Sequence, residues 1–163
     1  EMQGTYPLPE AQRDRFMASI SMGYPTRAAE LDMLEHHGAS NPLDDLRPVT
    51  DAAGILAARR QVGEVFVHAA LKDYVVSIVS ATRTSDSLRL GASPRASLQL
   101  LRASRARAAM QGRGYVIPED VDVLTVPVLA HRVLLSHRAH TSQASTADVL
   151  ASIVAAISTP RRT

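Results

Sequence analysis

The clearest pattern in the chain is a helical repeat of apolar residues near its middle. Across residues 71–82 these positions recur at spacings of three and four, which places them on one face of an amphipathic helix. A second long helix is predicted to begin at Ser93-Pro94, where a capping residue precedes a proline suited to the first helical position. It should end near Gln111, because Gly112 follows.

Shorter patterns predict four further helices, which begin at capping residues or prolines. These helices cover residues 26–37, 51–61, 118–137 and 147–157. Gly38 and Gly63 should end the first two, and Ile55 and Leu56 should be buried. Pro127 should kink or split the helix over residues 118–137.

Three short runs have the composition of β-strands. Residues 65–67 and 115–117 are predicted to pair as a small two-stranded element. A strand over residues 16–22 should follow a short helix that begins at Pro9, whereas residues 84–91 are polar and should form a turn. The predicted fold is mainly α, a helical bundle with a two-stranded β element, preceded by a helix-strand stub.

Composition excludes several classes of site. The 163 residues include no Cys, so disulfides, thiolate metal ligands and Cys nucleophiles are absent. The sequence contains no GxxxxGK[ST] loop, no GxSxG and no HExxH, and its histidines lack a ligand pair at helical spacing, so we expect no metal site. Net charge is +2 and Lys72 is the only lysine, so nearly all the positive charge is arginine.

The start of the helix at Ser93 is the strongest candidate site. Within residues 91–96 the exposed N–H groups of a helix N-terminus form an anion site, and Arg95 lies in the first turn. Arg102 lies two turns further on the same face, and Leu98 and Ala109 near that face indicate that it is not simply solvent-exposed. The alternative is that both arginines pair with acids on neighbouring helices.

A second candidate is the charged segment of residues 12–16, at the end of the short first helix. The alternative to a functional role is that this segment is a solvated helix end, with Arg15 near the negative end of the helix dipole.

Taken together, six segments resemble the MoxR family of AAA+ ATPases, in the family's order and over about residues 1–138. The segments are Gly4–Gln12, Asp14–Phe16, Ala81–Arg83, Gly91–Ala96, Gly112–Val121 and Pro127–Arg132. The resemblance implies that residues 1–25 end the α/β ATPase core, residues 26–140 form the AAA+ lid bundle and residues 141–163 form a tail. Because the chain starts at Glu1 rather than Met, we expect it to be a piece of a longer protein.

The resemblance also implies residue roles. Arg15 corresponds to the arginine finger, which reaches the γ-phosphate held by a neighbouring subunit. Arg95 corresponds to sensor 2, which touches the γ-phosphate in its own subunit, with Ser93 and Pro94 near the phosphates. Arg13 stands where the family usually has an apolar residue. Because it places a second arginine beside Arg15, the resemblance alone does not decide which of the two is the arginine finger.

For the whole protein, the resemblance implies an ATPase that uses ATP and Mg²⁺ and works as a cytoplasmic, hexameric, chaperone-like ring. Its partners would be client proteins, including proteins with von Willebrand A domains. Without the phosphate-binding loop, this chain should be inactive alone and bind no cofactor.

Two other functions are compatible with the residues. A nucleic-acid-binding module is suggested by the pI of about 9.4 and by the arginines at 102, 105, 107 and 113. However, Arg107 lies opposite Arg102 on the helix and aromatic residues for base stacking are scarce. The other alternative is a helical protein-interaction adaptor with no nucleotide role.

Overall fold

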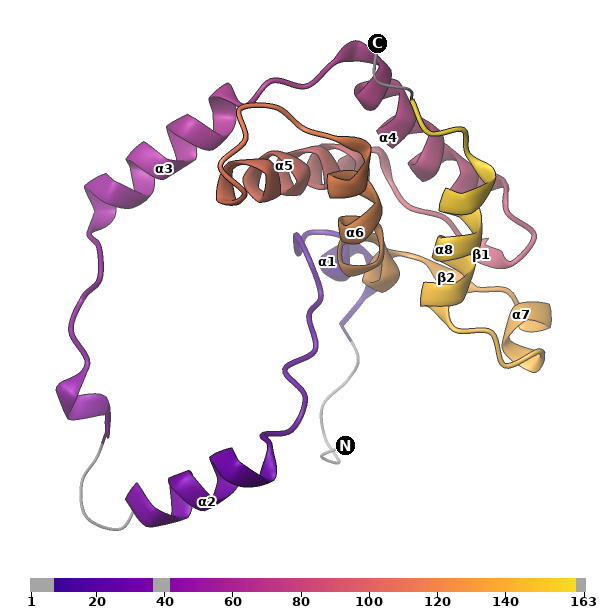
Figure 1. Cartoon of the computed structure of the whole chain (residues 1–163). Coiled ribbons are helices and arrows are strands. Elements are labelled where there is room, and N and C mark those ends of the chain that lie inside the picture. The colour runs from indigo at the N-terminus through magenta and orange to yellow at the C-terminus, as the bar shows by residue number, and fades with distance from the viewer. Residues whose placement is uncertain (1–7, 37–41, 161–163) are drawn as a thin grey trace. The chain divides into compact units, whose positions relative to one another are not determined.

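The computed structural model describes residues 8–36 and 42–160 (Figure 1). The first segment of the family signature, up to Pro7, the predicted helix end at Gly38 and the last three residues lie outside the described part. The chain divides into two compact units. One contains the residues up to Ser19 and from Arg60 onward, and the other is Ile20–Arg59.

The larger unit is a bundle of helices with a small sheet, as the sequence predicts. Helix α5 packs against α4 and α6, and α8 packs against α4 and α6 (Figure 1). Its helices are α1 (Glu10–Arg13), α4 (Ala69–Thr84), α5 (Pro94–Met110), α6 (Pro118–Leu129), η2 (Ala130–Arg132), α7 (His137–Thr141) and α8 (Thr146–Ala156).

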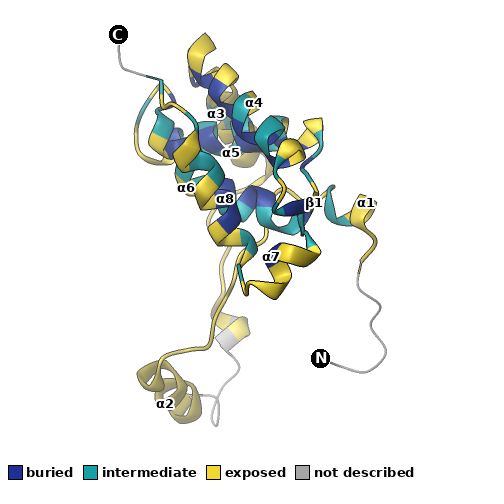
Figure 2. Ribbon diagram, turned by 90° about the vertical axis from the view of Figure 1, so that its right-hand side faces the viewer, coloured by how far each residue is buried: buried dark blue, intermediate teal, exposed yellow. Residues whose placement is uncertain are grey.

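Buried residues concentrate where the four long helices α4, α5, α6 and α8 meet (Figure 2). All six positions of the repeat that predicted α4 are buried, from Leu71 to Thr82. In α5 the buried residues Ala96, Leu100, Ser104 and Ala108 recur every four residues, and most are small. Small side chains let helices approach closely, so α5 packs against α4 and α6 with little aromatic surface.

The start of α6 is fixed by a buried carboxylate. Asp120 accepts hydrogen bonds from Arg113 Nη1 and Nη2 at 2.7 and 2.6 Å and from the N–H of Ile117 at 3.0 Å. Burial alone would raise the pKa of Asp120, but these hydrogen bonds outweigh it and the pKa lies below its ordinary value. The Gly112–Val121 segment is therefore held by the Arg113–Asp120 ion pair, and Asp120 also pairs with Arg107 of α5 at 3.3 Å.

The observed sheet is not the predicted one. Strand β1 (Leu88–Leu90) pairs antiparallel with β2 (Leu134–Leu135), and both lie in segments predicted as a turn and a helix. Residues 65–67 and 115–117 meet only in a single parallel bridge, between Phe66 and Tyr115. Strands of two and three residues are too short to show alternation, which is why the pattern missed them.

Two further predictions fail between the stub and the end of α6. Residues 16–22 form no strand, and their apolar side chains are largely exposed, including Ile20 at 76% and Met22 at 89%. Helix α6 continues through Pro127 to Leu129, tightens into η2 and then becomes extended, rather than continuing to His137. Because a proline has no N–H to donate, the helix is weakened where it turns toward the sheet.

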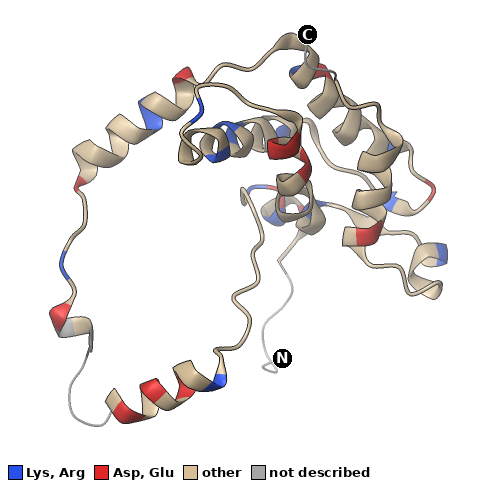
Figure 3. Ribbon diagram, in the orientation of Figure 1, with Lys and Arg blue, Asp and Glu red and all other residues tan. Residues whose placement is uncertain are grey.

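The smaller unit contains α2 (Arg27–His36), η1 (Pro42–Asp45) and the first part of α3 (Ala52–Glu64). Thr26 and Asp51 accept hydrogen bonds from Ala29 N at 3.3 Å and Gly54 N at 2.8 Å, and so cap these helices as predicted. Helix α2 carries three acids (Figure 3).

Two predictions for α3 are wrong. The helix runs past Gly63, and Ile55 and Leu56 are 53% and 49% exposed. The pattern correctly predicted a helix, but it did not predict burial, since no described residue of the smaller unit is buried. None of the described helices is long and apolar enough to span a membrane.

Candidate functional site

The end of α4 and the start of α5 bind one another through two of the segments that the sequence singled out. The N–H of Ala92 donates to Thr82 Oγ1 at 2.9 Å, and Arg83 Nε donates to the carbonyl of Ala92 at 2.7 Å. A Cβ at Gly91 would lie 2.6 Å from the carbonyl oxygen of Thr82. Only glycine permits this approach, so Gly91 sets the position of the α5 N-terminus against α4.

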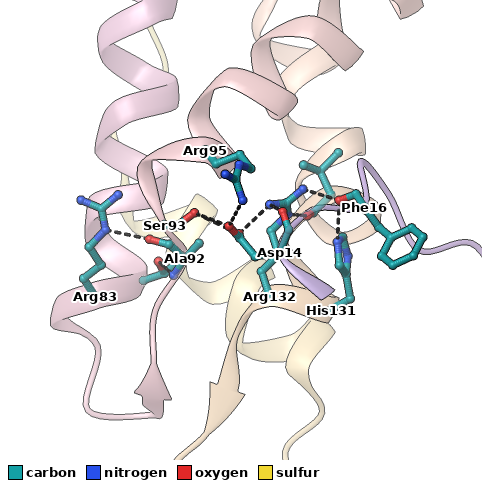
Figure 4. A network of polar contacts seen from close by, with 10 residues as sticks. Asp14, Phe16, Arg83, Ala92, Ser93, Arg95, His131 and Arg132 are labelled. Atoms are coloured by element: carbon teal, nitrogen blue, oxygen red, sulfur yellow. Dashed lines mark hydrogen bonds and ion pairs between the residues drawn. The ribbon is translucent and has the colours of Figure 1, made fainter. Parts of the chain in front are cut away.

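The carboxylate of Asp14 lies at that N-terminus (Figure 4). Ser93 Oγ donates to its two oxygens at 2.9 and 3.0 Å, Arg95 Nη1 donates at 3.2 Å, and Arg132 Nη1 donates at 2.7 Å. The group bound at the start of α5 is thus a carboxylate of the same chain, held by the side chains of Ser93 and Arg95. This is the alternative expected for Arg95, an ion pair with an acid, although the acid lies after α1 rather than on a neighbouring long helix.

Arg132 is the central residue of this network, and no role was predicted for it. Its side chain is fully buried. Besides the Asp14 carboxylate it donates to the backbone carbonyls of Val128, Asp14 and Phe16. The sequence contained Arg132 only as the last residue of a family segment. An arginine just after an apolar helix was the available signal, but two of its partners, Asp14 and Phe16, lie more than a hundred positions away.

The side chains of Arg13 and Arg15 have different surroundings. Arg15 lies in the turn after α1 and is exposed, with no side-chain partner in the described part of the chain. Arg13 ends α1 and is partly covered, and its Nε is buried without a hydrogen-bond partner. Of the two, Arg15 is the arginine whose side chain is available to another molecule.

Arg102 does not join the network. Arg95 and Arg102 lie seven residues apart on α5 and both are exposed, as is Leu98 at 57%. This side of the helix therefore faces solvent beyond its first turn, contrary to the prediction based on Leu98. Only Arg95 is close enough to the helix N-terminus to share an anion with it.

We expect the imidazole of His131 to titrate below its ordinary pKa of 6.5. Burial lowers the pKa more than the hydrogen bond from Nε2 to the Phe16 carbonyl, at 3.1 Å, raises it. Below pH 6.5 the unfolded chain then binds more protons than the folded chain, so the folded state loses stability as the pH falls from 6.5 through the lower pKa of the folded state. An NMR titration of the His131 ring measures the pKa directly. A value at or above 6.5 contradicts the prediction, and His131→Gln should flatten that pH dependence.

In the described ranges, His, Asp and Glu side chains form no group of three or more that could hold a metal ion. The groups gathered at the start of α5 are two arginines, a serine and one carboxylate.

Comparison with known proteins defines the class. Residues 80–153 match the AAA lid domain. The chain is 37% identical, over 99% of its length and 45% of the relative's, to the chaperone MoxR1 of Mycobacterium tuberculosis. It is 39% identical to YeaC of Bacillus subtilis (strain 168), an uncharacterized protein, over 98% of this chain and 50% of that one. The chain thus spans about half the length of these curated relatives.

A solved structure agrees with the sequence comparisons. A candidate ATPase from Cytophaga hutchinsonii superimposes with a TM-score of 0.88 at 30% identity, over 99% of this chain and 52% of that one. The protein MoxR of Paracoccus denitrificans is 34% identical over 83% of the chain and 46% of its own length. The fold is that of an AAA+ lid with its preceding segment. The chain belongs to the MoxR family of AAA+ ATPases.

Proposed function

We propose that this chain is the lid-bearing part of a longer, ATP-hydrolysing, chaperone-like protein, to which it contributes Arg15 and Arg95. The observation that carries the proposal is the pair of side chains, Ser93 and Arg95, that bind a negative group at the start of α5. There Ser93 and Arg95 already bind a carboxylate, and Arg15 is the next residue along the chain from that carboxylate. A phosphate oxygen has the same charge and hydrogen-bonding needs as a carboxylate oxygen.

The two arginines have distinct proposed roles. Arg15, exposed and without a described partner, is suited to reach the γ-phosphate of ATP held by a neighbouring subunit. Arg95 acts as sensor 2 and contacts phosphate together with Ser93, next to Pro94 at the helix N-terminus. ATP and Mg²⁺ would be held mainly by parts of the protein outside this chain, since the sequence lacks the phosphate-binding loop. The chain alone should hydrolyse no ATP.

The lid would couple nucleotide state to movement. Arg95 lies on α5, which packs against α4 and α6, so a phosphate that attracts Arg95 would act on those two helices as well. In the whole protein we propose a cytoplasmic homo-oligomer, a hexameric ring, that assembles or matures client proteins. Proteins with von Willebrand A domains are candidate clients.

In the full-length protein, Arg95→Ala should lower kcat for ATP hydrolysis by roughly 10²-fold or more, the typical effect of losing one donor to a transition-state oxyanion. Steady-state phosphate release measures this change. Arg102→Ala is the matched control, because Arg102 lies on the same helix, is exposed and lies outside the Asp14 network. Wild-type turnover in Arg95→Ala would remove Arg95 from the proposed site. Equal losses in both variants would indicate a general effect of charge on α5.

A further inference from the structure

The lid contacts the backbone on both sides of Arg15. The guanidinium of Arg132 donates through Nη1 to the carbonyl oxygen of Asp14 at 2.6 Å and through Nη2 to the carbonyl oxygen of Phe16 (Figure 4). These two carbonyls belong to the residues immediately before and after Arg15. Two hydrogen bonds from one planar group fix both the position and the direction of the segment between them.

Arg132 is itself held rigidly. Its side chain is fully buried, and its Nε donates to the carbonyl of Val128 at 2.8 Å, which fixes the guanidinium to the end of α6. His131 Nε2 contacts the Phe16 carbonyl at 3.1 Å, and Ser19 N donates to the Pro127 carbonyl at 2.9 Å.

Asp14 joins this contact to the proposed nucleotide site. Its carboxylate binds Arg132 Nη1 at 2.7 Å and Arg95 Nη1 at 3.2 Å, while its carbonyl binds Arg132. A change in the partner of Arg95 therefore acts on the residue that precedes Arg15. By contrast, the side chain of Arg15 is exposed and makes no hydrogen bond or ion pair within the described residues, so we expect its direction to depend on its backbone.

We propose that Arg132 is a positioning residue for Arg15: it holds the two flanking carbonyls so that the arginine finger is presented to the neighbouring subunit. The inference rests on the proposed function and deepens it. Arg132 touches no nucleotide itself, and its effect on hydrolysis passes through Arg15. The lid of one subunit thereby sets the activity of the site next to it.

The test uses mixed oligomers of the full-length protein. Arg132→Met should lower kcat by about 10²-fold, the typical cost of misplacing a catalytic group by about 1 Å, with little change in KM for ATP. These subunits are then mixed with subunits whose phosphate-binding loop lysine is replaced but whose Arg15 and Arg132 are intact. Arg15→Ala subunits, mixed in the same way, serve as the reference.

If Arg132 acts through Arg15, the mixture should recover hydrolysis to the same extent as the Arg15→Ala mixture, because each defective finger is replaced by an intact one from a neighbour. Recovery with Arg15→Ala but not with Arg132→Met would overturn the positioning role while leaving the proposed function standing. Recovery with neither variant would overturn the proposal that Arg15 acts on ATP held by a neighbouring subunit, and the role of Arg132 would fall with it.

Two further variants separate positioning from stability. Arg113→Met breaks the tight ion pair with Asp120 at the opposite end of α6, so it should reduce stability and leave kcat near wild type. An equal kcat loss in Arg113→Met would contradict a specific role for Arg132. If Arg132→Met does not assemble, as judged by size-exclusion chromatography, Arg132→Lys carries the same mixed-oligomer test. Its ammonium keeps the charge but cannot match the planar fork, so kcat should still fall.

Discussion

Arg15→Ala should slow ATP hydrolysis by the full-length protein by ~10³–10⁵-fold, the range measured for removing an arginine finger. That loss corresponds to about 4–7 kcal/mol of activation barrier. In the proposed role, the Arg15 guanidinium would neutralise charge that develops only in the phosphoryl-transfer transition state, so ATP binding should change little. An exposed ion pair contributes at most about 1 kcal/mol, so the size of the effect distinguishes a finger from a solvated helix end. Single-turnover hydrolysis together with equilibrium ATP binding measures both quantities.

Arg13→Ala is the matched control, because it removes the same side chain two positions earlier. Arg13 ends α1 and is partly covered, so we expect hydrolysis close to wild type. Near-normal turnover in Arg15→Ala would contradict the finger assignment, and so would a loss of ATP affinity as large as the loss of turnover. A large effect of Arg13→Ala alone would reassign the role to Arg13.

Leu100→Ala should destabilise the chain by about 2–5 kcal/mol, because it leaves a cavity in a close-packed interior. Leu100 is 0% exposed and lies on α5, the helix that packs against both α4 and α6. For a chain of this size, the melting temperature should fall by roughly 5–15 °C. Thermal and urea unfolding monitored by circular dichroism measure the change.

Leu98→Ala provides the comparison on the same helix. It deletes the same atoms at the same intrinsic helix propensity, but Leu98 is 57% exposed, so its effect should stay within about 0.5 kcal/mol. If the two variants lost equal stability, burial in α5 would not be what holds the bundle together.

Local signals were enough to predict most of the helices. The α4 face follows from its own spacing, and the start of α5 follows from Ser93-Pro94, because both depend only on neighbours within a few residues. The burial predicted for Ile55 and Leu56 was wrong. An amphipathic pattern predicts an apolar face, but it does not say whether the same chain supplies the surface that covers it.

The contacts of the site could not be predicted from local sequence. Asp14 and Arg132 bind one another across most of the chain, and nothing in the segment around either residue specifies the partner. The helix N-terminus beside Arg95 could be predicted because Ser93-Pro94 is a local signal for the start of a helix. The position of Asp14 at the start of α5 depends instead on how α1 packs against η2.

The pairing of β1 with β2 has a consequence for biosynthesis. Leu88 pairs with Leu135, and the whole of α5 and α6 lies between them. At a synthesis rate of about 5–20 residues per second, β1 waits on the order of several seconds before its partner leaves the ribosome. Closing so long a loop is entropically costly, so the pair should form only after the two helices have collapsed onto α4. On a nascent chain the sheet would therefore be among the last parts of this bundle to form, although it is short.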